Sequence, residues 1–305
     1  MRIVRGLESY PSDARESAVA LGVFDGVHLG HRAILAAAVA EARRHGLVAL
    51  ACTYDPHPLE VLQPARAPVP LTTLPDRLAL IAETGVDAAV VVAFTREVAA
   101  VEPEAFVRDV LVERLKARDV VVGFNHRFGR GARGTAALLE ALAPRLGFRA
   151  HVVAPLEVEG TAVSSSEVRA ALQAGDLERA ARLLGRPYSA EGEVVRGAGR
   201  GRTLGFPTAN VRTGRPLPLP PGVYACQALL GPDRYPAVVN VGVRPTFGET
   251  ELLVEAHLLD FSGDLYGRRL RLAFLRRLRE ERKFPDVESL RRQIALDVAA
   301  AREGI

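Results

Sequence analysis

The chain has 305 residues, of which 48% are hydrophobic, and its formal net charge is +4. This length and composition predict two globular domains and exclude intrinsic disorder. Nearly all the positive charge comes from arginines that are spread along the chain, and only 6% of the residues are aromatic. A nucleic-acid binder usually concentrates basic and aromatic residues on one face, so we expect anionic small molecules as partners and no nucleic acid.

The two cysteines, Cys52 and Cys226, each lie inside an apolar run, one in each half of the chain. This placement predicts two buried free thiols and no disulfide framework. The sequence contains neither a signal-peptide pattern at its start nor an apolar stretch long enough to span a bilayer. We therefore expect a cytoplasmic protein that does not bind membranes. The pattern does not indicate an oligomeric state.

In the first half of the chain, short apolar runs alternate with segments of helical periodicity. A helix is expected at 31–45, with Ile34, Leu35, Ala38, Val39 and Ala42 on one face and Gly46 as its C-terminal stop. Such alternation predicts an α/β domain with a parallel sheet covered on both faces. The expected strands are 18–24, 48–54, 88–94, 120–124 and 151–154.

The pattern changes after about Leu184, where strand-like runs follow one another with Gly and Pro turns between them. These runs predict a small antiparallel β-barrel, closed by a C-terminal helix at 286–302. Two short helices precede Gly185, which gives predicted domains at 1–184 and 185–305. The expected barrel strands are 191–195, 223–230, 237–243, 252–260 and 270–278.

The first predicted strand leads directly into a glycine-rich segment and a helix start. Gly22, Gly26 and Gly30 allow a ligand to approach the backbone closely, and a helix N-terminus offers N–H groups and a positive dipole to phosphate. His28 and His31 are three residues apart, so they should point to the same side and donate hydrogen bonds to phosphate oxygens. Surface or helix-capping roles for the two histidines are the alternative.

Two further segments have the composition of anion-binding loops. Ser164, Ser165 and Ser166 precede a helix that carries Arg169 in its first turn, although an ordinary N-cap would have the same residues. Further along, Gly197, Gly199 and Gly201 lie in a glycine- and arginine-rich segment that does not match the Walker spacing. The choice there is between a flexible anion-holding loop and a plain surface turn.

The H-x-G-H segment at 28–31 and the distant S-S-S-x-x-R segment at 164–169 together resemble the nucleotidylyl transferase superfamily, which uses them to hold the triphosphate of ATP. The strings at 22–31, 54–58 and 122–130 look like the adenylyltransferase half of bifunctional riboflavin kinase/FAD synthetase. The resemblance implies a Rossmann-like domain with Phe24 also in the ATP site. It further implies nucleotide or flavin contacts for His57, Asn125, Arg127 and Phe128. The chain departs from the family at Tyr54 and at Asn125 with His126.

The second half contains Leu-Gly-Phe-Pro-Thr-Ala-Asn at 204–210, which closely resembles the signature of riboflavin kinases. The resemblance assigns Thr208 and Asn210 to Mg-ATP, and their oxygens are the hard ligands that Mg²⁺ prefers. It also places the catalytic base of the kinase at Glu255, because riboflavin presents a neutral hydroxyl that must lose its proton. Without the resemblance, a polar turn and a solvated strand face would be the readings of these segments.

The resemblance covers nearly the whole chain and implies two ATP-dependent reactions. Riboflavin would be phosphorylated to FMN, and FMN would be adenylylated to FAD with release of pyrophosphate. The expected partners are ATP, riboflavin and FMN, with Mg²⁺ bound together with ATP and with FMN and FAD as product or substrate. The alternatives are a riboflavin kinase with an inactive adenylyltransferase-like domain, and a flavin-responsive regulatory protein.

Overall fold

A computed structural model of the chain describes residues 1–197, 201, 204–245 and 250–303. The chain forms two compact units. The first comprises Met1–Pro68 and Thr72–Ser164, and the second comprises Val69–Leu71 and Ser165–Ile305. Among the residues that the structure describes, no helix is both long enough and apolar enough to cross a membrane.

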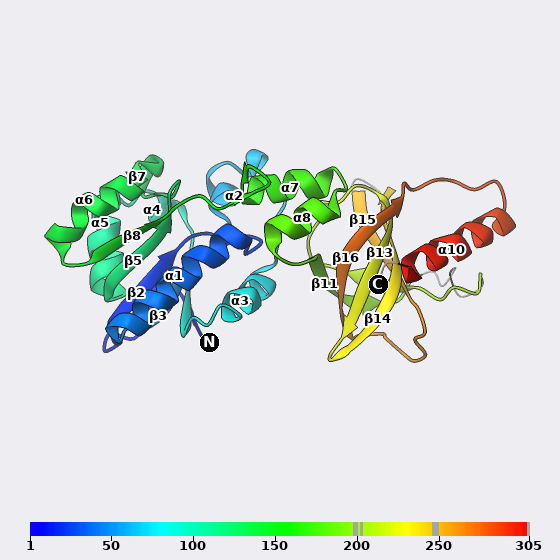
Figure 1. Cartoon of the computed structure of the whole chain (residues 1–305), viewed down its shortest axis with the longest axis horizontal. Helices are drawn as coiled ribbons and strands as arrows, with labels where there is room; N and C mark the ends of the chain where they lie inside the picture. Colours follow the sequence, from blue (N-terminus) through cyan, green and yellow to red (C-terminus); the bar gives the residue numbers. More distant parts are fainter. Residues whose placement is uncertain (198–200, 202–203, 246–249, 304–305) are drawn as a thin grey trace. The chain divides into compact units, whose positions relative to one another are not determined.

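The first unit is built on a parallel sheet of six strands in the order β1-β4-β3-β2-β5-β8 (Figure 1). The apolar runs of the sequence form its central strands, because a parallel sheet buries both of its faces. Two short antiparallel pairs, β6–β7 and β9–β10, lie outside the sheet. The strands are β1 (Arg2–Arg5), β2 (Ser17–Leu21), β3 (Val48–Asp55), β4 (Ala88–Ala93), β5 (Ala117–Gly123), β6 (Arg127–Phe128), β7 (Gly134–Thr135), β8 (Arg149–Val153), β9 (Glu157–Val158) and β10 (Thr161–Ala162).

The two faces of this sheet carry different side chains and different helices. One face is largely alanine and packs against α1 and α3, whereas the other carries larger aliphatic residues and packs against η3 and α6. The alternation along each strand, as in Ala18, Val19, Ala20 and Leu21, produces both faces at once. The helices are α1 (Leu29–His45), α2 (Pro58–Leu62), α3 (Leu74–Ala82), α4 (Arg96–Ala99), α5 (Pro103–Ala105), α6 (Ala136–Leu146), the 3₁₀ turns η1 (Leu7–Ser9), η2 (Pro64–Arg66) and η4 (Arg130–Ala132), and the π-helical η3 (Phe106–Arg114).

The second unit contains a closed antiparallel barrel in the order β11-β12-β15-β14-β13-β16, which Figure 1 shows in green, yellow and orange. Closure leaves the barrel without a free edge, so its backbone groups are paired around the ring. Two helices precede the barrel and one follows it. These elements are α7 (Ser165–Gln173), α8 (Leu177–Leu184), β11 (Tyr188–Val195), β12 (Ala209–Arg212), β13 (Gly222–Leu230), β14 (Asp233–Pro245), β15 (Thr250–Leu258), β16 (Arg269–Arg279) and α10 (Val287–Arg302).

Helix α10 is fixed to the outside of the barrel by a buried ion pair and an apolar cluster. Asp297 is 4% exposed and accepts hydrogen bonds from Arg279 Nε at 3.0 Å and Gln293 Nε2 at 2.8 Å. Val298 packs on the cluster that contains Val223 and Ala301. The helix thereby covers the outer face of β13 and β14.

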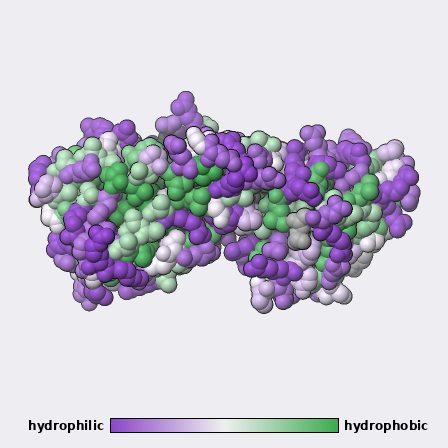
Figure 2. Space-filling view, viewed as in Figure 1, coloured by the Kyte–Doolittle hydropathy of each residue, from purple (hydrophilic) through white to green (hydrophobic). Residues whose placement is uncertain are grey.

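The predicted fold class is confirmed in both units, and so are the two buried free thiols. Burial raises the pKa of Cys52 to about 12, so this thiol stays protonated at neutral pH. Two strands of the main sheet and the barrel were not expected from the sequence, namely β1 at the sheet edge and β12 in the barrel, and neither were the short pairs β6–β7 and β9–β10. On the face shown in Figure 2, hydrophobic residues form separate groups between hydrophilic ones.

Candidate functional site

The loop between β2 and α1 combines left-handed backbone with burial. Phe24, Gly26 and Val27 have φ angles of 54°, 82° and 40°. Only glycine adopts such angles without cost, and a β-branched residue there is strained. Phe24 and Val27 are nonetheless fully buried, so packing against the helices holds the loop in this conformation. Strain of this kind is typical of sites that bind a ligand through their backbone.

Thr72, just before α3, holds this loop in place through Asp25, which belongs to the loop. Asp25 is 4% exposed and accepts hydrogen bonds from the backbone N–H and the hydroxyl of Thr72, both at 3.0 Å. The Thr72 hydroxyl oxygen in turn accepts from the Gly26 N–H at 3.1 Å. The hydrogen bonds between Thr72 and the segment at Asp25 and Gly26 therefore fix the middle of the glycine-rich segment.

A buried arginine fixes the beginning of the same loop. Arg77 is 5% exposed, and its Nη1 donates to the carbonyl oxygens of Val23 and Tyr54, both at 2.9 Å. The Thr53 hydroxyl also donates to the Val23 carbonyl, at 2.8 Å. Burial lowers the pKa of Arg77, but the reference value is so high that the guanidinium remains charged. A fixed positive charge thus lies under the carboxyl ends of β2 and β3.

The two histidines of the H-x-G-H segment stack on each other at the start of α1. Their ring centroids are 3.6 Å apart with an interplanar angle of 17°. His28 is the N-cap residue, and its Nδ1 accepts a hydrogen bond from the His31 N–H at 3.2 Å. Because Nδ1 is an acceptor, the neutral His28 ring carries its proton on Nε2, where it can be donated. The capping role and a phosphate-binding role are therefore compatible.

Gly30 leaves room for a second segment of the first unit. A Cβ at Gly30 would lie 3.2 Å from the His28 ring and 3.5 Å from the Val163 carbonyl oxygen. The chain therefore passes Gly30 directly before Ser164. Ser165, Ser166 and Arg169 belong to α7 in the second unit, where Arg169 Nε donates to the Val69 carbonyl at 2.8 Å. That these three residues join the histidines around one triphosphate stays a prediction.

The residues expected to contact nucleotide or flavin have different environments. His57 caps α2 and accepts from the Leu59 N–H at 3.1 Å. Asn125 and Arg127 are exposed, whereas Phe128 is 5% exposed and packs in the core with Phe106.

The neighbours of Asn125 also differ in exposure. The exposed aromatic residue of this segment is Phe124, which directly follows β5 and is 48% exposed. Burial lowers the pKa of His126 to about 4, so this ring is neutral at physiological pH.

In the barrel, three polar residues stand side by side on neighbouring strands. The register places Asn210 of β12 opposite Glu255 of β15, and Glu255 opposite Asn240 of β14. Directly opposed residues share a sheet face, with Cβ atoms about 5 Å apart. Val254 and Ala256 are buried on the opposite, inner face, so the row lies on the outer face of the barrel. Asn240 was not singled out from the sequence, because only the strand register brings it to Glu255.

Two described glycines lie against the residues assigned to Mg-ATP. A Cβ at Gly197 would lie 2.1 Å from Asn210 Nδ2, and a Cβ at Gly201 would lie 2.8 Å from Thr208 Oγ1. Any larger residue would therefore collide with these side chains or displace them. Gly199 lies outside the described residues. A hydroxyl and an amide oxygen on adjacent extended backbone, cradled by glycines, are a donor set that fits Mg²⁺ with bound phosphate.

Two cavities meet at Thr208. The larger has a volume of about 780 Å³ and lies on the outer face beneath α10, with Asn240, Glu255 and His257 in its wall. The smaller has about 480 Å³ and opens on the other side of Thr208, next to Phe261 and Tyr266. His257 is held by a 2.7 Å hydrogen bond between its Nδ1 and the Pro207 carbonyl. The rest of the larger cavity is lined by two kinds of residue. Apolar side chains include Val223, Val238, Leu253, Phe284, Leu290 and Ile294, and the charged ones are Arg279, Glu281, Arg282, Lys283, Asp286 and Asp297.

Comparisons with known proteins assign each half of the chain to a family. Residues 10–167 match the FAD synthetase family and residues 184–305 match the riboflavin kinase family. A bifunctional riboflavin kinase/FMN adenylyltransferase of Escherichia coli is 39% identical over an alignment of 305 residues that covers 99% of this chain and 97% of that protein. A protein of the same name from Bacillus subtilis is 38% identical and covers 92% of this chain and 90% of its own length.

A solved structure has the same fold over nearly its full length. It is a Streptococcus pneumoniae protein described as a macrolide-efflux protein, with a TM-score of 0.88, 28% identity and 99% coverage of both chains. The matched families follow each other in the same order as the parallel sheet and the barrel. The chain therefore belongs to the family of bifunctional riboflavin kinase/FMN adenylyltransferases.

Proposed function

We propose that this chain phosphorylates riboflavin to FMN with one ATP and adenylylates FMN to FAD with a second ATP, releasing pyrophosphate. The observation that carries the proposal is the placement of Glu255 and Thr208 in the wall of one cavity that also has apolar walls. A tricyclic flavin needs such walls, and its ribityl hydroxyl needs a base and a phosphate donor at one end.

In the kinase reaction, Glu255 takes the proton from the terminal hydroxyl of riboflavin as its oxygen attacks the γ-phosphorus of ATP. The bond from γ-phosphorus to the β,γ-bridging oxygen breaks, and ADP leaves. The larger cavity holds the flavin, because Glu255 must contact the hydroxyl, and the smaller cavity beside Tyr266 holds the adenine nucleotide. Thr208 lies between the two. Thr208 and Asn210 would hold Mg²⁺, which would supply positive charge to the phosphates.

The adenylyl transfer needs no base, because the attacking FMN phosphate is already an anion. Its oxygen attacks the α-phosphorus of ATP, and pyrophosphate leaves. The chain then has to position the phosphates and neutralise their charge. The N-terminus of α1 supplies N–H groups and a positive dipole, and His28 Nε2 supplies a further donor. The family resemblance implies that Ser164, Ser165, Ser166 and Arg169 contribute to the phosphate site. It also implies that Asn125, Arg127 and Phe128 contact the nucleotide or FMN.

Two variants test the proposal reciprocally. Glu255→Gln keeps the size of the side chain but removes the base, so FMN formation from riboflavin should fall by about 100-fold or more. FAD formation from added FMN should be unchanged. His28→Asn/His31→Ala keeps an N-cap acceptor and should give the opposite result, with FMN accumulating and little FAD.

Chromatography of riboflavin, FMN and FAD after incubation with Mg-ATP measures both activities in each variant. If Glu255→Gln forms FMN at the wild-type rate, Glu255 is not the base. If the wild type converts riboflavin only as far as FMN, the chain is a riboflavin kinase with an inactive adenylyltransferase-like domain. If neither product forms, a flavin-responsive binding protein becomes the better explanation.

A further inference from the structure

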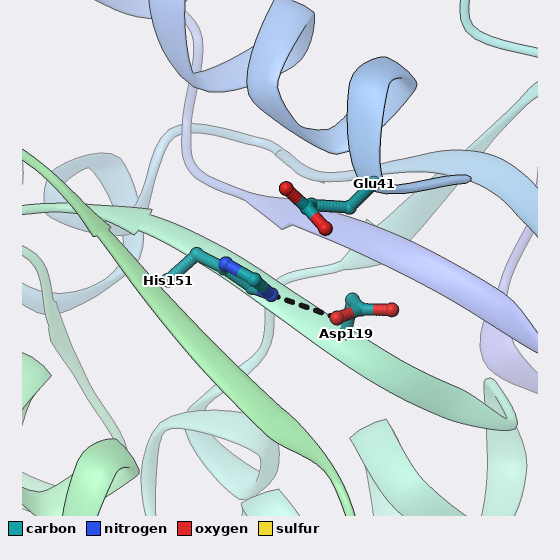
Figure 3. A group of neighbouring side chains, drawn as sticks. All are labelled: Glu41, Asp119 and His151. Carbon is teal, nitrogen blue, oxygen red and sulfur yellow. Dashed lines mark hydrogen bonds and ion pairs between the residues drawn. The ribbon is translucent and has the colours of Figure 1, made fainter. Parts of the chain in front are cut away.

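A second group of side chains of the types that bind metals lies at the edge of the first unit, away from the loop between β2 and α1. We call that loop the phosphate loop. Glu41 comes from the last turns of α1, Asp119 from β5 and His151 from β8 (Figure 3). One ligand atom of each lies within 4.8 Å of the others. Asp119 pairs with Ala18 at the beginning of β2, whereas the phosphate loop follows the end of that strand. The group is therefore separate from the adenylyltransferase site.

Asp119 is the centre of the group. It is fully buried, and both of its carboxylate oxygens accept hydrogen bonds from Arg149. Nε donates to Oδ1 at 2.7 Å and Nη2 donates to Oδ2 at 2.6 Å. His151 Nε2 lies 2.7 Å from Oδ1, and His45 Nδ1 lies 3.2 Å from Oδ2. A carboxylate has about four lone-pair sites, two on each oxygen. Arg149 uses one site on each oxygen, so one site on each remains for the histidines. Burial raises the pKa of Asp119, but the hydrogen bonds from Arg149 and His151 outweigh it and leave the pKa lowered.

Glu41 provides the observation that indicates a missing cation. Its Oε2 is inaccessible to solvent and has no hydrogen-bond partner among the residues that the structure describes. His45 Nδ1 lies 3.7 Å from Oε2, and Arg44 Nη1 lies 3.4 Å from the other oxygen, Oε1. A buried carboxylate oxygen without a donor is costly, and the C-terminal end of α1 adds further negative potential. A positive charge between Glu41, Asp119 and His151 would relieve both.

We propose that Glu41, Asp119 and His151 form a binding site for a divalent transition metal. Carboxylate and imidazole together are ligands of Zn²⁺, whereas Mg²⁺ prefers oxygen ligands alone. The metal replaces the proton shared by His151 Nε2 and Asp119 Oδ1. Arg149 remains on Asp119 as an outer hydrogen-bond donor, which ligating carboxylates commonly have.

The tetrahedral geometry of zinc requires ligand atoms about 3.3 Å apart, which follows from bond lengths near 2.0–2.1 Å. The pair formed by His151 and Asp119 has to open slightly, and the side chain of Glu41 has to close the remaining distance. Both changes are side-chain rotations at the rim of the sheet. The bound metal joins α1, β5 and β8, so it should stabilise the first unit without altering either reaction.

Calorimetric titration of the metal-stripped full-length protein with ZnCl₂ tests the site. We expect one Zn²⁺ per chain and a higher melting temperature for the wild type. Glu41→Gln and His151→Asn should each weaken binding by about tenfold or more, since each removes a ligand and even the loss of an outer-shell partner costs that much. Glu140→Gln, on the exposed face of α6, is the matched control and should bind as the wild type does.

Anomalous diffraction from wild-type crystals soaked in ZnCl₂ locates the ion without relying on variants. The expected peak lies about 2.0–2.2 Å from oxygens of Glu41 and Asp119 and from His151 Nε2. A peak only at other residues, no peak at all, or unchanged affinity in both ligand variants would overturn the proposal. FAD formation by the variants should match the wild type, because the cluster contacts neither set of proposed substrate residues.

Discussion

Arg77 is a charged residue with a structural task at the phosphate loop. Its guanidinium donates to the carbonyl oxygens that end β2 and β3, and it lies almost entirely out of solvent. The Val23 carbonyl oxygen has a second hydrogen-bond donor, the Thr53 hydroxyl. The Tyr54 carbonyl oxygen therefore depends more on the hydrogen bond from Arg77. The loop that approaches the phosphates therefore rests on a residue that contacts no substrate in the proposed site.

Replacing Arg77 with Met should lower the stability of the first unit by about 2 kcal/mol, the value of a hydrogen bond to a charged group. The loop should also lose its fixed shape, so FAD formation from FMN should fall while the kinase activity remains. Arg43→Met is the control, because the Arg43–Asp87 pair is exposed and should contribute little to stability. Scanning calorimetry and the two activity assays measure these effects. A variant that keeps wild-type FAD formation would show that Arg77 does not shape the loop.

The sequence identified residues whose types and spacing form motifs, but not the residues that support them. Gly22, Gly26, His28 and His31 are visible because they follow one another in a short segment. Arg77 is a single arginine within a helical pattern, and such residues are usually exposed. Its burial depends on the parallel register of β2 and β3, which no local pattern records.

At the level of elements, the barrel is closed by the antiparallel pair β11–β16. Glu191 of β11 lies opposite Arg271 of β16 and accepts a hydrogen bond from Arg271 Nη2 at 2.9 Å. Arg269 donates a hydrogen bond to the same carboxylate. Burial raises the pKa of Glu191, but the hydrogen bonds from the two arginines lower this pKa by more than burial raises it. The net shift of the pKa is therefore downward. The carboxylate therefore stays charged across the neutral range and holds the two strands together.

Glu191→Gln should destabilise the barrel by about 1–2 kcal/mol at pH 7, since it removes charge-assisted hydrogen bonds. The folded pKa is lower than the unfolded one, so this stabilisation is present above the unfolded pKa of about 4.3 and is lost as the pH falls through the folded pKa. The difference between variant and wild type should thus shrink below about pH 4. Glu193→Gln, on the same strand but in an exposed pair with Arg212, should have a smaller effect. Urea unfolding at several pH values measures both, and a difference that persists in acid would contradict the assignment.

Most barrel strands were predictable because their alternation is regular, but β12 was not. It begins at Ala209, two residues after Pro207, and its first two residues belong to the binding motif at 204–210. The strand exists because Asn210 pairs with Val195 on one side and Glu255 on the other. The motif thus runs into the sixth strand, which is why the proposed metal ligand Asn210 and the proposed base Glu255 stand next to each other.

At the level of the whole molecule, the second unit extends beyond the barrel in sequence. It includes α7 and α8, and also Val69–Leu71 from the first half of the chain. Arg215 donates to the carbonyl oxygens of Pro70 at 2.9 Å and Leu71 at 2.8 Å. The division at 184/185 stays a prediction; the riboflavin kinase family match begins at 184, whereas the compact unit begins at Ser165. A sequence pattern cannot reveal that a three-residue segment packs with a distant domain.

These two boundaries lead to different expectations for isolated fragments. All residues of the proposed kinase site lie after β11 begins, so fragments 165–305 and 185–305 should both phosphorylate riboflavin if they fold. Fragment 185–305 lacks α8, whose Leu177, Leu183 and Leu184 are buried and which packs on β11 and β16. Because each buried leucine contributes about 1.5–3 kcal/mol, the shorter fragment should be less stable by about 3 kcal/mol or more.

Both fragments lack Val69–Leu71, so both should be less stable than the same unit within the full chain. Fragment 1–184 contains every residue assigned to adenylyl transfer, from Gly22 to Arg169, and should form FAD from FMN. Thermal melts and separate assays for FMN and FAD compare the three fragments with the full chain. Equal melting temperatures for 165–305 and 185–305 would mean that α7 and α8 add nothing to the barrel unit, and that the division at 184/185 is also the physical one.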